Sequence, residues 1–269
     1  MTGRTWTGAH ALHAEWTKLR TVPGTALLAP ALAVLLAAVG AAVTATVDTS
    51  HCATPAGCAE DTPKLALSGV QLGQVVAVVL GVLAIGSEYT SGTIAATLAA
   101  VPGRSTVLAA KAAVVAGLAA AGGTAGVLAS LAAGRWILPG GGFTAANGYP
   151  PLSPADGPTA RAAAGTVLYL VLVALLALGV AAVLREPTAA VGAVLAVLWL
   201  LPVVARLAGD DAWRERLEKF APMTAGLAVQ TTRGVERLPI GPWQGLGVLA
   251  LYTAAALLAG GAALALRDA

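Results

Sequence analysis

The sequence predicts an all-α membrane protein whose chain crosses the bilayer six times. Of its 269 residues, 57% are apolar and only 11% are charged, whereas a soluble domain carries about 25% charged residues. The mean hydropathy is +0.79. Six mostly apolar stretches each reach the roughly 18 residues that a helix needs to cross the hydrocarbon layer. Together these observations favour a polytopic helical protein over one or two soluble domains.

The six predicted spans are residues 24–47, 65–86, 107–133, 162–184, 189–207 and 243–266. Residues 24–269 therefore form one transmembrane domain, and residues 1–23 precede it. This polar leader is too long for a signal peptide and five further spans follow, so we expect the first span to be retained.

Lysine and arginine in short loops favour a cytoplasmic N-terminus. With that orientation the cytoplasmic side holds seven basic residues: Arg4, Lys18, Arg20, Arg104, Lys111, Arg185 and Arg267. The first two outer loops hold Lys64, Arg135 and Arg161. The last outer loop holds six more, but five acidic residues nearly neutralise them, and we give that loop less weight. Six spans then place both termini in the cytoplasm of a cell-membrane protein. Lys111 lies near the start of its span, where it is expected to extend to the interface.

Residues 5–20 (TWTGAHALHAEWTKLR) place Trp6, Leu12 and Trp16 at helical spacing. The pattern predicts an amphipathic helix on the cytoplasmic membrane surface, with Trp at headgroup depth and Lys18 near lipid phosphates.

A second amphipathic segment, residues 87–105 (SEYTSGTIAATLAAVPGRS), follows the second span. It is too short to cross and too apolar for a solvated loop. Ile94, Leu98 and Val101 are expected on the apolar side of a short surface helix. Glu88 either caps that helix, because a carboxylate is favoured near a helix N-terminus, or meets a basic group of a partner.

Residues 209–237 combine a short amphipathic helix, with Trp213, Leu217 and Phe220 on one side, and the apolar run APMTAGLAV. That run is far too short to span, and it is typical of a re-entrant or interfacial segment.

Cys52 and Cys58 are the only cysteines and lie in the first outer loop (HCATPAGC). That loop faces an oxidising compartment in the predicted orientation, where disulfides persist. We therefore favour a disulfide over two free thiols.

Polar groups inside the spans are few. Gln71 and Gln74 are three residues apart in the second span and are interpreted as lying on one face, where they either pair between helices or line a substrate path. The pairs Gly69/Gly73 and Gly122/Gly126 have the spacing that permits close helix contact, although such matches are common in a chain so rich in glycine and alanine.

Residues of the usual catalytic sites are missing from the sequence. No lysine is followed by Ser or Thr, so there is no phosphate-binding loop of the GxxxxGK[ST] type. The three histidines, His10, His13 and His51, lack partners at metal-ligand spacing. Basic residues do not cluster, which argues against nucleic-acid binding. We expect no enzyme activity, no cofactor and no metal on this chain.

Residues 15–25 (EWTKLRTVPGT) and 86–111 (GSEYTSGTIAATLAAVPGRSTVLAAK) resemble the corresponding segments of actinobacterial ABC-2 type transporter permeases. The last span with its tail ALALRDA, and the run FAPMTAGLAV, are similar to that family's last span and its extracellular re-entrant region. The charged segment 210–219 departs from the family pattern.

The resemblance implies a permease subunit that pairs with a second copy or a paralogue and with a separate cytoplasmic ABC ATPase, which holds ATP and Mg. Residues 1–23 would then form the elbow helix, and the segment between spans two and three the coupling helix that contacts the ATPase. The coupling residues expected from the resemblance are Glu88, Tyr89, Gly92, Thr93 and Arg104.

The expected function is therefore export of a substrate that the sequence does not identify, such as a drug, antibiotic, peptide or lipid. The alternatives are an ATP-independent secondary transporter, which needs ionisable or broken-helix sites, and a membrane assembly protein without transport.

Overall fold

A computed structural model describes residues 8–21, 23–50, 52, 54, 58, 60–100, 103–207 and 211–267. Within these ranges all regular structure is helical, and six helices are long and apolar enough to cross a membrane. The prediction of an all-α protein with six candidate spans is confirmed.

The six spanning helices are α3 (Leu28–Thr46), α5 (Val70–Thr90), α7 (Arg104–Ile137), α8 (Gly157–Leu184), α9 (Pro187–Leu207) and α12 (Pro242–Arg267). The shorter α-helices are α1 (Gly8–Thr21), α2 (Pro23–Ala26), α4 (Thr62–Ala66), α6 (Ile94–Ala100), α10 (Asp211–Phe220) and α11 (Pro222–Leu227). The 3-10 turns within the described residues are η2 (Leu138–Gly141), η3 (Ala145–Asn147), η4 (Ala228–Gln230) and η5 (Val235–Arg237).

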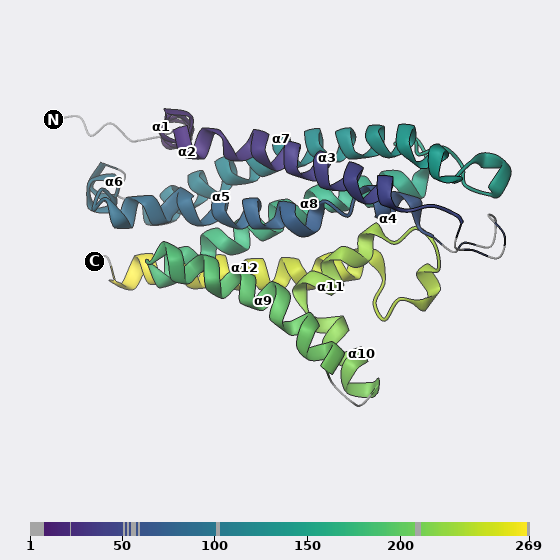
Figure 1. Ribbon diagram of the computed structural model, residues 1–269. Helices are drawn as coiled ribbons and strands as arrows, with labels where there is room; N and C mark the ends of the chain where they lie inside the picture. Colours follow the sequence, from purple (N-terminus) through teal and green to yellow (C-terminus); the bar gives the residue numbers. More distant parts are fainter. Residues whose placement is uncertain are drawn as a thin grey trace.

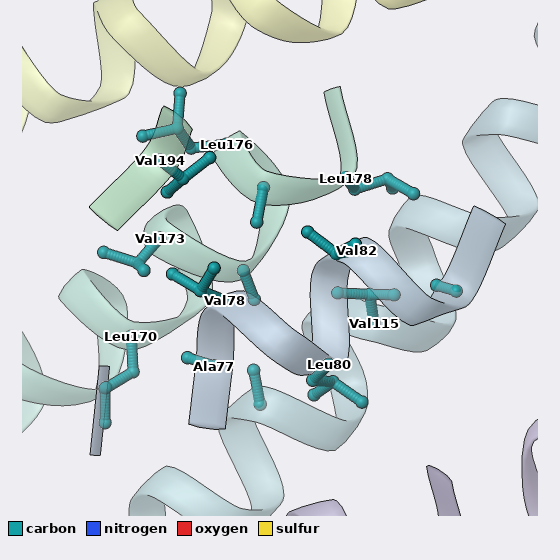
Figure 2. Packing of buried hydrophobic residues seen from close by; sticks show 14 of the residues in the cluster. Ala77, Val78, Leu80, Val82, Val115, Leu170, Val173, Leu176, Leu178 and Val194 are labelled. Atoms are coloured by element: carbon teal, nitrogen blue, oxygen red, sulfur yellow. The ribbon is translucent and has the colours of Figure 1, made fainter. Parts of the chain in front are cut away.

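Helix α8 is the centre of the bundle and packs against α5, α7, α9 and α12. Ala77, Val78 and Val82 of α5 lie among Leu170, Val173 and Leu178 of α8 in the buried core (Figure 2). Because lipid tails are as apolar as these side chains, the association of the helices depends on van der Waals packing between small and branched residues.

Helix α3 packs against α5 and α7. The contacts occur at the two glycine pairs. A Cβ at Gly122 would lie 2.6 Å from Ala29 O, and one at Gly126 would lie 2.6 Å from Leu36 Cδ1. A Cβ at Gly69 or Gly73 would likewise collide with Leu36. Both sequence patterns are therefore sites of close helix contact in this fold.

The bundle has two ends of different character. Helices α1, α2 and α6 and the C-terminal part of α12 lie at one end, which we call the terminal end (Figure 1). The C-terminal end of α3, helix α4 and the α7–α8 connection lie at the opposite end, which we call the loop end (Figure 1). This arrangement agrees with an even number of crossings.

Three spans differ from their predicted limits by more than three residues. The second begins at Val70 and not at residue 65, because Asp61 and Pro63 start the separate helix α4, which a turn at residues 67–69 divides from α5. The third extends over Arg104–Gly141, because α7 begins at Arg104, three residues before the predicted start, and continues through Ile137 into turn η2. The fourth begins at Gly157 and not at residue 162, because Asp156 caps the helix at that point.

The segment between α9 and α12 has the predicted two parts. In α10, Trp213 and Phe220 are exposed and Leu217 is half-buried. Helix α11 and turn η4 then fold back against α8 and α12, where Ala225 and Val229 are fully buried. Gln230 donates a hydrogen bond to Thr166 Oγ1 at 2.9 Å and thereby joins this short segment to the central helix.

The two predicted surface segments form helices α1 and α6. Leu12 and Trp16 on α1 are exposed, and Ile94 and Leu98 on α6 are half-buried. Trp6, Val101 and Pro102 lie outside the described residues.

Candidate functional site

Four charged side chains form a network at the terminal end. Lys111 of α7 is 1% exposed, and its Nζ donates to Glu88 Oε1 at 2.7 Å, to Glu15 Oε2 at 2.8 Å and to Ala84 O at 3.0 Å. Glu88 lies in the last turn of α5, and Glu15 lies on α1. One ammonium therefore holds helix α1 and two spans together.

Lys18 of α1 extends the network to the surface helix α6. Its Nζ donates to Glu88 Oε1 at 2.9 Å, to Glu15 Oε1 at 3.1 Å and to Thr97 Oγ1 of α6 at 3.2 Å. The Lys18 side chain is 46% exposed. Helices α1, α5, α6 and α7 thus meet at two lysines and two glutamates.

The charges of this network balance, which explains how the fold tolerates them away from water. A buried ion is expensive unless it is paired and hydrogen-bonded. Lys111 satisfies all three of its protons. Glu88 Oε2 is buried and has no hydrogen-bond partner among the described residues.

Burial of Lys18 opposes its charged form, but the hydrogen bond to Glu88 and the charge of Glu15 outweigh that effect. The pKa of Lys18 is therefore raised. The partners of Lys18 stabilise its ammonium form.

Glu88 has a different position from the one the sequence indicated. It ends α5, whereas α6 begins at Ile94, so it does not cap the surface helix. It is 7% exposed and is paired with Lys18 and Lys111 of the same chain. A direct contact between Glu88 and a partner would require this network to open.

The prediction that Lys111 extends to the interface is wrong. The side chain is buried because α1 covers the end of α7 and places Glu15 within hydrogen-bond distance of Nζ.

The other predicted coupling residues have separate surroundings. Tyr89 is half-buried beneath the guanidinium of Arg185, whose Cζ lies 5.6 Å from the ring centroid. Gly92 adopts φ +70° in the turn between α5 and α6, a conformation that a side chain would strain. Thr93 is exposed, with its Oγ1 2.8 Å from Ser91 Oγ.

Arg104 faces the C-terminal helix. Its Nη1 donates to Ala265 O at 2.6 Å and to Leu264 O at 3.2 Å, carbonyls in the last turn of α12 that lack helical partners. Arg104 therefore caps α12 and ties the chain's last helix to the start of α7.

Gln71 and Gln74 do not share an environment. Gln74 is fully buried; its Oε1 accepts from the Tyr169 hydroxyl at 2.5 Å, and its Nε2 lies 3.7 Å from Met223 Sδ. Gln71 is exposed near the start of α5. The two positions are only about 60° apart around the helix axis, but α8 covers Gln74 and leaves Gln71 exposed, so the two amides do not act as one polar face. The contacts of Gln74 favour helix packing over a substrate path.

The loop end is held by a second polar network. Cys52 and Cys58 form a disulfide, and the Tyr149 hydroxyl donates to Cys58 O. The Asp61 carboxylate accepts from the backbone N–H and the hydroxyl of Thr232, each at 2.6 Å. Arg233 stacks on Tyr149, with its Cζ 4.5 Å from the ring centroid. Three loops that are far apart in sequence are joined here.

The network at the terminal end was only partly visible in the sequence. A lysine inside an apolar span requires a partner, and Glu15 and Lys18 have helical i,i+3 spacing, yet no local pattern shows that these groups meet. Among the described residues no group of three or more His, Cys, Asp or Glu side chains is placed to hold a metal ion.

No known protein family model matches this sequence. A search of curated proteins likewise found no match.

Proposed function

We propose that this chain is the membrane-spanning permease subunit of an ATP-driven exporter of the ABC type. In this proposal a separate cytoplasmic ATPase binds ATP and Mg, a second copy or a paralogue completes the permease, and the chain itself performs no catalysis. The terminal end, with both termini, faces the cytoplasm.

The observation that carries the proposal is the position of Lys18, which joins surface helix α6 to α1 and α5 through Thr97 and Glu88. A force applied to α6 would reach α5 through the short turn at residues 91–93, and it would reach α1 and α7 through the ion network. Packed interfaces respond to such a force by rigid-body movement, which is what an export cycle requires.

The surface that would receive the ATPase is the exposed side of α6. Ala95, Ala96 and Ala99 are exposed there together with Gly92 and Thr93. These small side chains allow a partner's backbone to approach closely. Glu88 and Lys111 would transmit the movement from behind this surface.

Copurification from the native host tests the proposal. A partner with a phosphate-binding loop should be retained, and its ATP hydrolysis should rise when this chain is present. Ala96→Glu on α6 should abolish that stimulation, whereas Ala155→Glu at the loop end, also on an exposed alanine, should preserve it. No such partner, or equal stimulation by both variants, contradicts the proposal.

The proposed orientation has its own test. Single cysteines placed at Ala96 and at Ala155 in a Cys52→Ser/Cys58→Ser background should differ in labelling by a membrane-impermeant maleimide added to whole cells. Position 155 should react and position 96 should not. The reverse pattern would place α6 on the side opposite a cytoplasmic ATPase.

A second candidate function, an ion-coupled secondary transporter, is favoured by one observation. Lys111, Glu88 and Glu15 form a buried ionisable cluster, and such clusters mark proton and ion pathways in transporters. The two functions are separated by the energy source: transport into vesicles should follow ATP in the first case and an imposed pH gradient in the second.

A further inference from the structure

An apolar groove of about 430 Å³ opens between α7 and α8. Its lining residues are Thr124, Val127, Leu128, Ala163, Ala164, Val167 and Leu168. Its volume lies within the range of about 300–1,000 Å³ that is typical of ligand pockets. Leu128 and Leu168 are about half exposed along its rim, so the groove opens to the side of the bundle.

Charged residues fix the depth of this groove in the membrane. On α8, Arg161 and Arg185 enclose 23 uncharged residues, and on α7 the exposed Arg135 ends an uncharged stretch of the same length. At 1.5 Å per residue, each stretch measures about 35 Å, enough to cover a hydrocarbon core of about 30 Å. Arg135 and Arg161 therefore lie at headgroup level in one leaflet, and the groove begins just below them in the hydrocarbon.

Both arginines lie on the helix faces that border the groove. Arg135 follows Leu128 by seven residues and Arg161 precedes Leu168 by seven, so each returns to the same face after two turns, about 10 Å along its helix. Arg135 is exposed. Neighbouring Trp136 is 85% exposed, as expected for an aromatic anchor at the membrane interface.

The charges of Arg135 and Arg161 are not neutralised by an acidic side chain of the described chain. Arg135 has one long hydrogen bond, to Leu152 O at 3.5 Å. Arg161 donates to Thr231 O at 2.7 Å, and its buried Nε has no hydrogen-bond partner among the described residues. Guanidinium groups bind phosphate through paired hydrogen bonds.

We infer that this groove binds one phospholipid of the loop-end leaflet. One acyl chain occupies the apolar cleft, and the phosphate lies between Arg135 and Arg161. An apolar cleft below two cationic groups complements the polarity of a phospholipid, which has an apolar chain below an anionic phosphate. The inference stands apart from the proposed export function.

Native mass spectrometry of the full chain tests this site. The purified protein is titrated in mild detergent with dioleoylphosphatidylglycerol, and in parallel with dioleoylglycerol, which has the same chains and no phosphate. The unmodified protein should retain one phosphatidylglycerol per chain and retain dioleoylglycerol at least fivefold less.

Two kinds of variant separate the contribution of the lipid's acyl chain to binding from that of its phosphate. Ala164→Phe fills the cleft and should reduce retention of both lipids at least fivefold. Arg135→Gln should abolish the preference for phosphatidylglycerol. Ala255→Phe on α12 and Arg237→Gln at the loop end, both at exposed positions, should behave as the unmodified protein. Thr124→Leu, at another exposed wall position, replaces Ala164→Phe if that variant fails to fold.

Three results would overturn the inference. The first is that Ala164→Phe retains as much lipid as the unmodified protein, and the second is that the control variants lose as much lipid as the cleft variants. The third is that filling the cleft converts a dimer to a monomer and leaves lipid binding unaffected. The last result would assign the groove to a second copy of the chain.

Discussion

Lys111 Nζ lies 2.7 Å from Glu88 Oε1, and both side chains are buried where α7 and α5 meet α1. The pair depends on two further charges, because Glu15 binds the same ammonium and Lys18 binds the same carboxylate oxygen. The position of α1 is thereby coupled to those of two spans.

Removing one charge from this network should lower the free energy of unfolding more than removing a pair of opposite charges. Lys111→Met leaves Glu15 and Glu88 with only the partly exposed Lys18, and an unpaired buried charge costs about 3–5 kcal/mol. Lys111→Met/Glu88→Gln restores charge balance and should recover a large part of this loss. Thermal unfolding in detergent measures the three proteins, with Arg237→Gln as an exposed charge control.

The opposite ranking would contradict a balanced ion network. If Lys111→Met unfolds at the same temperature as the unmodified protein, the lysine contributes nothing to holding α1 on the bundle.

The spans could be predicted from sequence because each depends on a local property, the length of an apolar stretch. The partners of Lys111 could not, since Glu15 lies 96 residues away along the chain and meets it only after α1 folds across the bundle end. Because these partners are not visible in the local sequence, the sequence predicted that Lys111 extends to the membrane interface.

The two glutamines show another limit of sequence reasoning. Their spacing is known, but which of them faces a neighbour depends on where α8 packs, and only Gln74 meets Tyr169. The glycine pairs show the converse: a pattern too common to be specific, Gly122/Gly126, is an actual contact with α3.

Substituting alanine for glycine in α7 should have opposite effects at two positions. A Cβ at Gly117 meets no atom within 4 Å, whereas one at Gly122 would lie 2.6 Å from Ala29 O. Gly117→Ala should be neutral or stabilise by up to about 1 kcal/mol through helix propensity. Gly122→Ala should destabilise by about 1–3 kcal/mol, because a backbone oxygen must shift. Thermal unfolding of the two variants checks this contrast, and equal behaviour would argue against close α3–α7 packing.

Tyr169→Phe should leave the Gln74 carbonyl without its partner. The hydrogen bond between them is 2.5 Å long and fully buried, and such bonds between transmembrane helices contribute about 0.6–2 kcal/mol. The variant should lose stability by this amount and keep its transport rate, while Gln71→Leu at the exposed position should be close to neutral. A changed transport rate with unchanged stability would instead assign Gln74 to a substrate path.

The contribution of Lys18 should depend on alkaline pH. Its pKa is raised in the folded protein, so its stabilisation is fully present below the unfolded value of about 10.4 and is lost as the pH rises through the folded value. The side chain is 46% exposed, which limits the effect to about 1 kcal/mol or less. The difference in unfolding temperature between the unmodified protein and Lys18→Met should therefore be constant from pH 7 to 9 and shrink above pH 10. A difference that grows with pH would contradict this sign.

The disulfide should stabilise the loop end beyond its own short loop. Cys58 is 4% exposed, and its carbonyl receives the Tyr149 hydroxyl, while Asp61, three residues on, binds Thr232. Protein isolated without reductant should be lighter by two hydrogens than reduced protein, as intact mass spectrometry can measure.

Cys52→Ser/Cys58→Ser should lose about 2 kcal/mol, the value expected for closing a loop of this length. Asp61→Asn in that background should add a further loss, because the carboxylate then becomes the main tie between the disulfide loop and the segment after η4. Full maleimide labelling of both cysteines in unreduced protein would show that the bond is not formed and that the loop end is held by Asp61 and Tyr149 alone.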